Sequence, residues 1–477
     1  MQSGPRSFSS SPPTQSARAV ALSVLVKSVK SEEGVDALLD RSLASCSFDN
    51  RDRALAVELT YGVLRRLGTV DWRLAPVLDK PLPRLPIMVQ MLIRLGAYQI
   101  LYLDRIPQSA AVNESVELAR LNARVLGRDW GGFVNAVLRQ LIREPAPLWP
   151  DQAAHAAKAL AVRFSVPEWL SQRWIDRLGM VGAVAACKQS CSVPPLTLRI
   201  NRLKMAREEY LARLERAGVA ARPTSVSPMG VIVEDGGSIP SLPGFDEGLF
   251  YVEDEAAQLI PPLLDPHPGD VILDACAAPG GKATHIAELM NDQGTIYAID
   301  RKGSRLDLLR SNCRRLGMKS VEPLTGDVRH LSAWRHAVTG DRGLTCDAAT
   351  PVDRILVDAP CSGLGVLRRH PEAKWRKDNA AFDRHHRLQV QILDSVAPCL
   401  RPGGVLVYST CSTEPEENEA VIEQFLSVHL KFRRESVAPW LPSEAKQFLT
   451  ERGDLSTTGN RYSMDGFYAA RLKKVLV

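Results

Sequence analysis

The C-terminal half of the chain alternates short strand-like segments with stretches of helical length. In chain order the segments are DVILDACA, TIYAID, VEPLTGD, RILVDAP and GVLVYST. Strands that are separated by helices form a parallel sheet, because the connecting helices pack back onto its two faces. We therefore predict an α/β domain in this half of the chain.

Aspartates recur in these segments, at or near their ends. Four of the five contain one, and the residues are Asp274, Asp300, Asp327 and Asp358. The ligand crevice of an open parallel sheet lies beyond the carboxyl ends of its strands. A single aspartate there can simply cap a helix, but several around one loop favour a ligand site. We place Asp300, Asp327 and Asp358 in that site.

The loop CAAPGGK, residues 276–282, follows the first strand and precedes a helix. Gly280 and Gly281 allow a ligand to approach the backbone, and the helix N-terminus offers free N–H groups. The loop is not a G-x-x-x-x-G-K-[ST] phosphate loop, since no Ser or Thr follows the lysine, and it lacks the G-x-G-x-x-G dinucleotide pattern. A nucleoside-type cofactor not held mainly by phosphates remains, with Asp300 on its ribose hydroxyls and Asp327 on an adenine amino group.

Two cysteines follow two of the predicted strands, Cys361 in DAPCSG and Cys411 in YSTCS. A disulfide between them is disfavoured, because nine cysteines without a framework spacing are typical of a chain in a reducing compartment, where thiols stay free. A metal site is also disfavoured, since no C-x-x-C pair or neighbouring histidine completes a tetrahedral set of ligands.

Nucleophilic thiols beside a nucleoside-type cofactor suit the alkylation of a cytosine. Carbon 5 of cytosine is a weak nucleophile until a thiolate adds at carbon 6. The adduct must afterwards lose the carbon 5 proton and expel the thiol, so a second thiol or base is useful. Asp358 is placed to stabilise the charge that develops at N3 of the ring. The residues alone leave open whether Cys361 or Cys411 attacks.

In order and spacing these motifs, with the closing segment DGFYAARLKK, resemble the Nop2/Sun family of S-adenosylmethionine-dependent RNA cytosine-5 methyltransferases over about residues 165–477. The resemblance implies that Cys411 attacks carbon 6, that Cys361 assists breakdown of the adduct, and that Asp358 is also catalytic. It implies S-adenosyl-L-methionine as the cofactor and no metal. The residues implied to hold this cofactor are Cys276, Ala277, Ala278, Pro279, Gly280, Gly281, Lys282, Asp300, Asp327 and Asp358.

The N-terminal part of the chain is basic and has helical periodicity, with Leu55, Leu59 and Val63 on one face. Residues 1–164 hold 21 Lys and Arg against 15 Asp and Glu, which accounts for the whole formal charge of +6. A basic module favours a polyanionic partner, although a solvated helical surface gives the same excess. The segments IPQSAAVNESVELAR and GFVNAVLRQL resemble the helical NusB fold. This combination of domains implies bacterial 16S rRNA as the substrate and partner.

We predict a multidomain chain, in which an all-α NusB-like bundle precedes a small α+β connector and a Rossmann-like class I methyltransferase domain. The predicted parts are a disordered tail at 1–15, a NusB-like RNA-binding domain at 16–150, the connecting domain at 151–245 and the methyltransferase domain at 246–477. The boundary after the bundle rests on the three prolines of EPAPLWP. A short transit peptide is the alternative for the Ser/Pro-rich tail.

The segment GVLRRHPEAKWR, which follows the Pro-Cys motif, is similar to an extension found in the NusB-containing members of the family. We predict that four of its basic residues bind RNA phosphates and that its tryptophan, Trp375, stacks on a base. A solvated loop is the alternative. The four basic residues are Arg368, Arg369, Lys374 and Arg376.

No apolar run approaches the roughly eighteen residues that a membrane span requires, so we expect no membrane partner. We also expect a monomeric, cytoplasmic protein that does not bind DNA. Two other functions remain open. One is the same chemistry on tRNA or on another rRNA site, and the other is a non-catalytic RNA-binding factor of the antitermination type.

Overall fold

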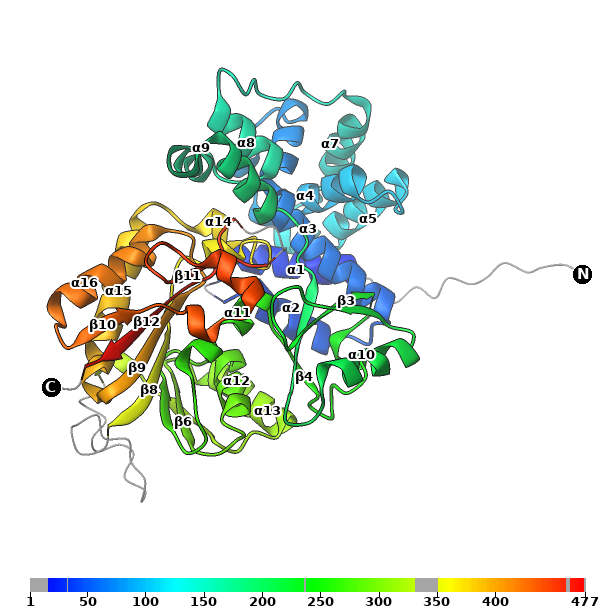
Figure 1. Cartoon of the computed structure of the whole chain (residues 1–477). Helices are drawn as coiled ribbons and strands as arrows, with labels where there is room; N and C mark the ends of the chain where they lie inside the picture. The colour runs from blue at the N-terminus through cyan, green and yellow to red at the C-terminus, as the bar shows by residue number, and fades with distance from the viewer. Residues whose placement is uncertain (1–15, 32, 236, 331–350, 460–463, 476–477) are drawn as a thin grey trace, which may run out of the picture. The chain divides into compact units, whose positions relative to one another are not determined.

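The computed structural model describes residues 16–31, 33–235, 237–330, 351–459 and 464–475, and it divides the chain into two compact units (Figure 1). The helical unit comprises residues 1–193 together with 367–376, and the sheet unit comprises residues 194–366 together with 377–477. The tail predicted at residues 1–15 lies outside the described residues. No helix in the described ranges is both long enough and apolar enough to cross a membrane.

Amphipathic helices build the helical unit around one apolar core. Leu59 and Val63 are fully buried and Leu55 packs against the same core, which confirms the predicted apolar face. Asp49 caps the longest helix, because its carboxylate accepts a hydrogen bond from the N–H of Asp52 at 2.8 Å. The helices that contribute to this core are α1 (Ala17–Lys30), α2 (Val35–Ala44), α3 (Asn50–Leu74), α4 (Ile87–Tyr102), α5 (Gln108–Leu121) and α7 (Gly131–Arg143).

The helical unit extends beyond the boundary predicted at residue 150. Helices α8 (Ala156–Phe164) and α9 (Glu168–Ser190) belong to it. The Thr69 hydroxyl donates to the carbonyl oxygen of Val162 at 2.6 Å, and the loop between α8 and α9 is likewise hydrogen-bonded to α3. The proline run therefore interrupts helices without ending the compact unit, because proline removes a helical hydrogen bond but does not prevent later helices from packing back. The division into two compact units does not follow the predicted domains, and the boundaries of the connecting domain at 151–245 stay a prediction.

A small antiparallel sheet opens the sheet unit, in the order β2-β3-β1-β4. Strands β1 and β3 lie in the segments PLTLRINR and GVIVED. Helix α10 (Arg207–Arg216) contributes Tyr210 and Leu214 to the core that this sheet buries. The strands are β1 (Leu196–Ile200), β2 (Ala220–Pro223), β3 (Gly230–Asp235) and β4 (Phe250–Val252).

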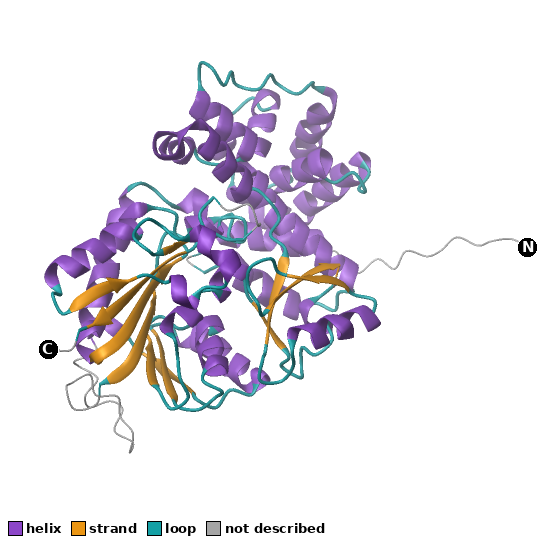
Figure 2. Ribbon diagram, viewed as in Figure 1, coloured by secondary structure: helices purple, strands orange, loops and turns teal. Residues whose placement is uncertain are grey.

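The larger sheet contains all five strands predicted from the C-terminal half (Figure 2). Its order is β10-β12-β9-β8-β5-β6-β7, and the five predicted strands β5 to β9 are parallel neighbours, whereas β12 is antiparallel to β9. The short strands β10 and β11 were not predicted. The strands are β5 (Val271–Asp274), β6 (Thr295–Asp300), β7 (Val321–Thr325), β8 (Val352–Asp358), β9 (Leu400–Thr410), β10 (Phe432–Glu435), β11 (Leu455–Ser456) and β12 (Tyr468–Lys474).

Helices cover both faces of this sheet (Figure 1). Alternate residues of the central strands face opposite ways, so that Leu356 belongs to one core and Ile355 to the other. Helices α12 (Gly281–Leu289) and α13 (Gly303–Leu316) complete the first core, and α15 (Ala380–Val396) and α16 (Glu419–Val428) complete the second. Since both faces are buried, polar side chains of the strands reach a ligand mainly at the strand ends.

Candidate active site

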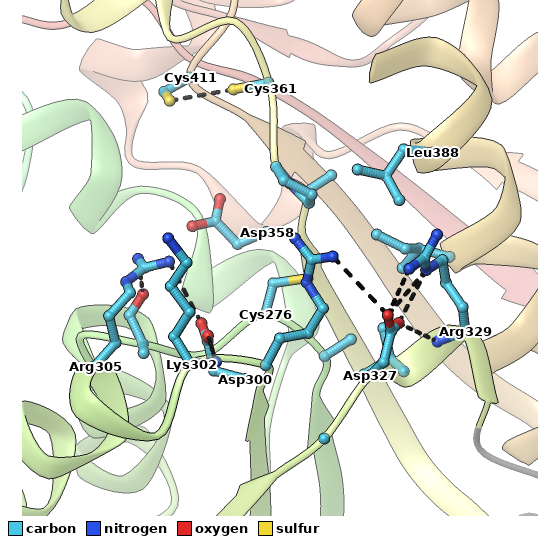
Figure 3. Close-up of a pocket in the computed structure, with 18 residues that line it drawn as sticks. Cys276, Asp300, Lys302, Arg305, Asp327, Arg329, Asp358, Cys361, Leu388 and Cys411 are labelled. Carbon is cyan, nitrogen blue, oxygen red and sulfur yellow. Dashed lines mark hydrogen bonds and ion pairs between the residues drawn. The ribbon is translucent and has the colours of Figure 1, made fainter. Parts of the chain in front are cut away.

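The carboxyl ends of the parallel strands gather the predicted site residues. Asp300 and Asp358 are the last residues of β6 and β8, and Cys411 directly follows β9. A cavity of about 260 Å³ at this edge is lined by these three residues together with Asp327 and Cys361 (Figure 3). A second cavity, of about 190 Å³, shares Cys276, Ala278 and Asp358 with the first and adds Asp274 and Lys282. The structure thus brings together residues that are more than a hundred positions apart in the sequence.

The two cysteines face each other at the upper end of the larger cavity. Their sulfur atoms are 3.3 Å apart, and both are free thiols (Figure 3). The hydrogen bond with Cys411 and burial together raise the pKa of Cys361 well above its ordinary value. Cys361 is therefore favoured as a neutral thiol. The absence of a bridge between this pair agrees with the prediction, whereas Cys399 is disulfide-bonded, which the prediction of free thiols did not foresee.

Asp358 is held between two hydrogen-bond donors. Its Oδ2 accepts a hydrogen bond from Lys282 Nζ at 2.7 Å, and its Oδ1 accepts one from the Ser409 hydroxyl at 2.8 Å. Burial disfavours charge on Lys282, but Asp358 outweighs it and raises the lysine pKa above its ordinary value. Lys282 is therefore held in its protonated form, and the two hydrogen bonds set the orientation of the carboxylate that lines both cavities.

Asp274 is an acid to which the sequence interpretation gave no role. It ends β5, is 0% exposed, and neither of its carboxylate oxygens has a hydrogen-bond partner within the described part of the chain. Burial, with a further contribution from Asp358, raises its pKa to about 7. The signal was present in the sequence, because Asp274 ends a strand just as Asp300 does.

The other two predicted acids are already engaged by arginines. Asp300 accepts the N–H of Lys302 at 2.9 Å, and Arg305 lies 3.5 Å from its second oxygen. Arg329 binds both oxygens of Asp327 and, with the surrounding charges, lowers the pKa of Asp327 to about 2 (Figure 3). An adenine amino group would have to share the Asp327 carboxylate with Arg329, so that contact stays a prediction.

The loop CAAPGGK is anchored by a buried arginine from the small sheet, which the sequence did not suggest. Arg199 on β1 donates to the carbonyl oxygen of Gly281 at 2.8 Å and is paired with Glu253 and Glu288. Gly280 has φ +108, and a Cβ at this position would lie 2.9 Å from the Leu309 side chain. The backbone of the loop is therefore held in one place at the N-terminus of α12.

The helix after the second cysteine motif begins later than its sequence suggests. Thr413 and Glu416 have the spacing of a capping box, which favours a helix start at that point, but residues 415–417 form a short 3-10 helix and α16 begins at Glu419. The extra turn directs the carboxylate of Glu417 to the serines that follow the two cysteines. Sequence reasoning missed this residue because it identified a helix cap one position earlier.

All four residues predicted to bind RNA belong to the helical unit, and two of them are buried in it. Arg368 and Lys374 are 2% and 0% exposed, and residues 367–376 are part of that unit. Lys374 Nζ donates to the carbonyl oxygen of Arg65 at 3.2 Å, and burial lowers its pKa to about 7. A side chain without exposed surface has no access to a phosphate, so RNA binding by Arg368 and Lys374 is not supported.

Other side chains of this segment also contact the helical unit. Trp375 Nε1 donates to the carbonyl oxygen of Leu64 at 3.3 Å, and Arg376 donates to that of Ser28. RNA binding by Arg369 and Arg376 stays a prediction. The motif GVLRRHPEAKWR is thus used largely for packing, which its basic composition alone does not reveal.

A parallel sheet of this order, with a glycine-containing loop after β5 and acids at the ends of β5 and β6, has the Rossmann-like fold of class I methyltransferases. Residues 261–473 match the family "16S rRNA methyltransferase RsmB/F", residues 15–143 match the NusB family, and residues 166–240 match the ferredoxin-like domain of RsmF/B-like methyltransferases. The chain belongs to the RsmB/F family of 16S rRNA methyltransferases. The predicted family resemblance and fold class are confirmed.

Full-length relatives support this assignment. The probable ribosomal RNA small subunit methyltransferase B of Synechocystis is 37% identical over 466 residues, covering 96% of this chain and 99% of the relative. The Bacillus subtilis protein of the same description is 34% identical over 465 residues, with the same coverage. The crystal structure of PH0851 has a TM-score of 0.80 at 26% identity over 98% of this chain and 99% of its own. The structure of a methyltransferase homolog from Pyrococcus horikoshii has a TM-score of 0.55 at 28% identity, and the match covers 67% of this chain and 99% of that protein.

Proposed function

We propose that this chain transfers a methyl group from S-adenosylmethionine to carbon 5 of one cytosine in 16S rRNA, with cytosine 967, the position that the family resemblance implies, as the target. The observation that carries the proposal is the pair of free thiols, 3.3 Å apart, beside a carboxylate and a cavity at the carboxyl ends of the strands. One thiol is needed to add to the ring and a second group to help the adduct break down. A non-catalytic scaffold has no use for two such thiols.

The residues present fit S-adenosylmethionine, which would supply an electrophilic methyl group. Asp274 is a buried carboxylate without a hydrogen-bond partner among the described residues, so it is suited to a ligand that carries positive charge. The backbone of residues 276–282 and the carboxylates of Asp300, Asp327 and Asp358 would hold the rest of the cofactor. The two adjoining cavities, which share Cys276, Ala278 and Asp358, give an elongated ligand room along the strand ends.

Cys411 would form a sulfur–carbon bond at carbon 6 of the cytosine, which moves an electron pair to carbon 5 and makes it nucleophilic. Asp358, held by Lys282 and Ser409, would hydrogen-bond N3 of the ring as charge develops there. After methylation the carbon 5 proton passes to a water molecule, the electron pair of the C–H bond restores the ring double bond, and the sulfur–carbon bond breaks with its own electron pair returning to Cys411. Cys361 would assist this breakdown. Its raised pKa favours a neutral thiol beside the departing sulfur of Cys411.

The proposal predicts opposite behaviour for the two cysteine variants. With labelled S-adenosylmethionine and 16S rRNA from a strain that lacks the gene, the unmodified protein should produce 5-methylcytosine at one position. Cys361→Ala should accumulate a covalent RNA adduct, whereas Cys411→Ala should form none and should lose activity by on the order of a thousandfold or more. The adducts are measured on denaturing gels.

Three outcomes would contradict the proposal in different ways. The reverse adduct pattern would overturn the roles of the two cysteines. Methylation of tRNA or of another rRNA cytosine in preference to the expected one would retain the chemistry but change the substrate. RNA binding without cofactor binding or methyl transfer would favour a non-catalytic RNA-binding factor.

A further inference from the structure

Glu417 connects the two loops that carry the reactive cysteines. It is 0% exposed and lies at the end of the 3-10 helix Pro415–Glu417. Its Oε1 accepts the N–H of Ser362 at 2.7 Å, and its Oε2 accepts hydrogen bonds from the hydroxyls of Ser362, at 2.5 Å, and Ser412. Ser362 and Ser412 directly follow the two cysteines in the sequence. One carboxylate therefore binds both loops at once.

The contacts around this carboxylate bring the two loops close together. The serine hydroxyls are 3.2 Å apart, and the thiols of Cys361 and Cys411 are 3.3 Å apart. Each of these close pairs takes one residue from each loop, so the carboxylate acts at the point where the loops meet. Removing the carboxylate would leave three buried donors without their acceptor, which costs more than the bonds themselves contribute.

The backbone also fixes Glu417 independently of the serines. Its carbonyl oxygen accepts a hydrogen bond from the Tyr408 hydroxyl at 2.6 Å, and Tyr408 is a fully buried residue of β9. A link between the loops themselves, from the N–H of Gly365 to the carbonyl oxygen of Cys411 at 2.9 Å, holds their backbone but not their serine side chains. The Glu417 carboxylate is thus presented to both cysteine loops from a short 3-10 helix, which follows Cys411 in the connection between β9 and α16.

A histidine from a helix lies beside the Glu417 carboxylate. His385 on α15 has its Nδ1 3.1 Å from Oε1 of Glu417, and its side chain is 20% exposed. Burial alone would raise the pKa of Glu417, but His385 and the two serine hydroxyls outweigh it, so that the pKa lies below its ordinary value. The resulting negative charge contributes to the raised pKa of Cys361. It therefore favours the neutral form of that thiol.

We propose that Glu417 is a positioning residue that holds the thiols of Cys361 and Cys411 side by side. It acts through hydrogen bonds to Ser362 and Ser412, and His385 lies beside its carboxylate. The catalytic purpose of this alignment rests on the proposed function. The hydrogen bonds that hold the two loops together require neither substrate nor cofactor. Glu417 acts through the neighbouring serines and not by bonding the thiols themselves. Its loss should disturb the alignment of the thiols before it disturbs the fold.

The test measures how fast the two thiols can meet. Diamide accepts two electrons and two protons from a pair of thiols and leaves a disulfide, so its rate with Cys361 and Cys411 reports their alignment. The linked peptides are quantified by mass spectrometry in the full-length protein without cofactor or RNA. We expect Glu417→Ala to slow this cross-link about tenfold, because charge-assisted hydrogen bonds are lost, and Glu417→Gln to slow it less.

Asp454→Asn is the matched control, because Asp454 is another fully buried acid of the sheet unit and accepts a hydrogen bond from the Tyr468 hydroxyl at 2.6 Å. It should leave the cross-linking rate unchanged. If Glu417→Ala does not fold, the double variant Ser362→Ala, Ser412→Ala should reproduce the slowing with Glu417 intact. Methyl transfer by the Glu417 variants should fall in kcat with little change in KM for the cofactor.

An unchanged cross-linking rate in folded Glu417→Gln and in the double serine variant would overturn the positioning role. This result is distinct from a failure of the proposed function. If the unmodified protein methylates no RNA, the cross-linking rates still decide whether Glu417 aligns the thiols, because they require neither substrate nor cofactor.

Discussion

Asp274 and Glu417 are both fully buried carboxylates of the sheet unit, and their surroundings are opposite. Neither oxygen of Asp274 has a hydrogen-bond partner among the described residues, whereas Glu417 accepts three hydrogen bonds and lies beside His385. The pKa of Asp274 is raised to about 7, and that of Glu417 is lowered. Burial acts on both acids, so the difference comes from their partners.

The contrast separates Asp274, a buried carboxylate without a partner among the described residues, from Glu417, a buried carboxylate that binds two loops together. A buried polar group without a partner costs free energy, and it persists where a ligand can supply the missing partner. A buried carboxylate with several donors instead stabilises one arrangement of the loops around it. We therefore propose that Asp274 belongs to the cofactor side of the site and that Glu417 aligns the thiols.

The largest expected effect is on the pH dependence of stability through Asp274. Its pKa is raised on folding, so its stabilising contribution is complete below about 3.8 and is lost as the pH rises through about 7. Relative to Asp274→Asn, the free energy of unfolding of the cofactor-free protein should fall by on the order of 3 kcal/mol between about pH 4 and about pH 8. Urea unfolding at several pH values measures it. Parallel pH profiles of the two proteins would contradict the raised pKa.

Glu417 should show the opposite dependence in the same experiment. Because folding lowers its pKa, its contribution is present above about 4.5 and is lost as the pH falls through the folded value. Glu417→Gln should therefore lose stability relative to the unmodified protein at neutral pH and should approach it in acid. If the stability contribution of Glu417 changed with pH in the same direction as that of Asp274, the opposite pH dependence expected of the two acids would be wrong.

A smaller effect is expected on cofactor affinity. Asp274→Asn preserves the shape of the side chain but removes the negative charge, so S-adenosylmethionine should bind about thirtyfold more weakly. Isothermal titration calorimetry measures the Kd directly. Asp454→Asn is again the control and should bind normally. An unchanged Kd for Asp274→Asn would mean that this carboxylate does not face the cofactor.

The sequence predicted the parts of this site that depend on local pattern. The five parallel strands and the acids at their ends follow from apolar segments and their spacing, and the cysteines follow from their places after β8 and β9. The role of Glu417 did not follow, because a hydrogen-bond partner from a distant segment has no local signal, whereas Asp274 carried a signal in its place at the end of β5. Arg199 was missed for the same reason, since its contacts with Glu253 and Glu288 join segments far apart in the chain.

Burial of the basic residues was the other feature that the sequence did not reveal. A run such as RRHPEAKWR is typical of an exposed, phosphate-binding loop, yet Lys374 is fully buried and hydrogen-bonded to Arg65. Charge pattern predicts exposure only on average, because a long side chain can bury its stem and find a carbonyl acceptor. The segment joins the helical unit from a position far along the chain, and sequence periodicity carries no information about such a contact.

The smallest expected effect on stability concerns Lys374, a buried residue whose charge is opposite in sign to that of Asp274 and Glu417. Because burial lowers its pKa to about 7, its contribution to stability is present above about 10.5 and is lost as the pH falls through about 7. Lys374→Met should raise the free energy of unfolding at about pH 6.5 by about 1 kcal/mol, since the gain from removing a buried charge exceeds the loss of one hydrogen bond. Affinity for 16S rRNA should stay the same, as a filter-binding titration at several salt concentrations would measure. If the slope of log affinity against log salt concentration is smaller in magnitude by about one for Lys374→Met than for the unmodified protein, Lys374 contacts a phosphate. This result would mean that the segment leaves the helical unit when RNA binds.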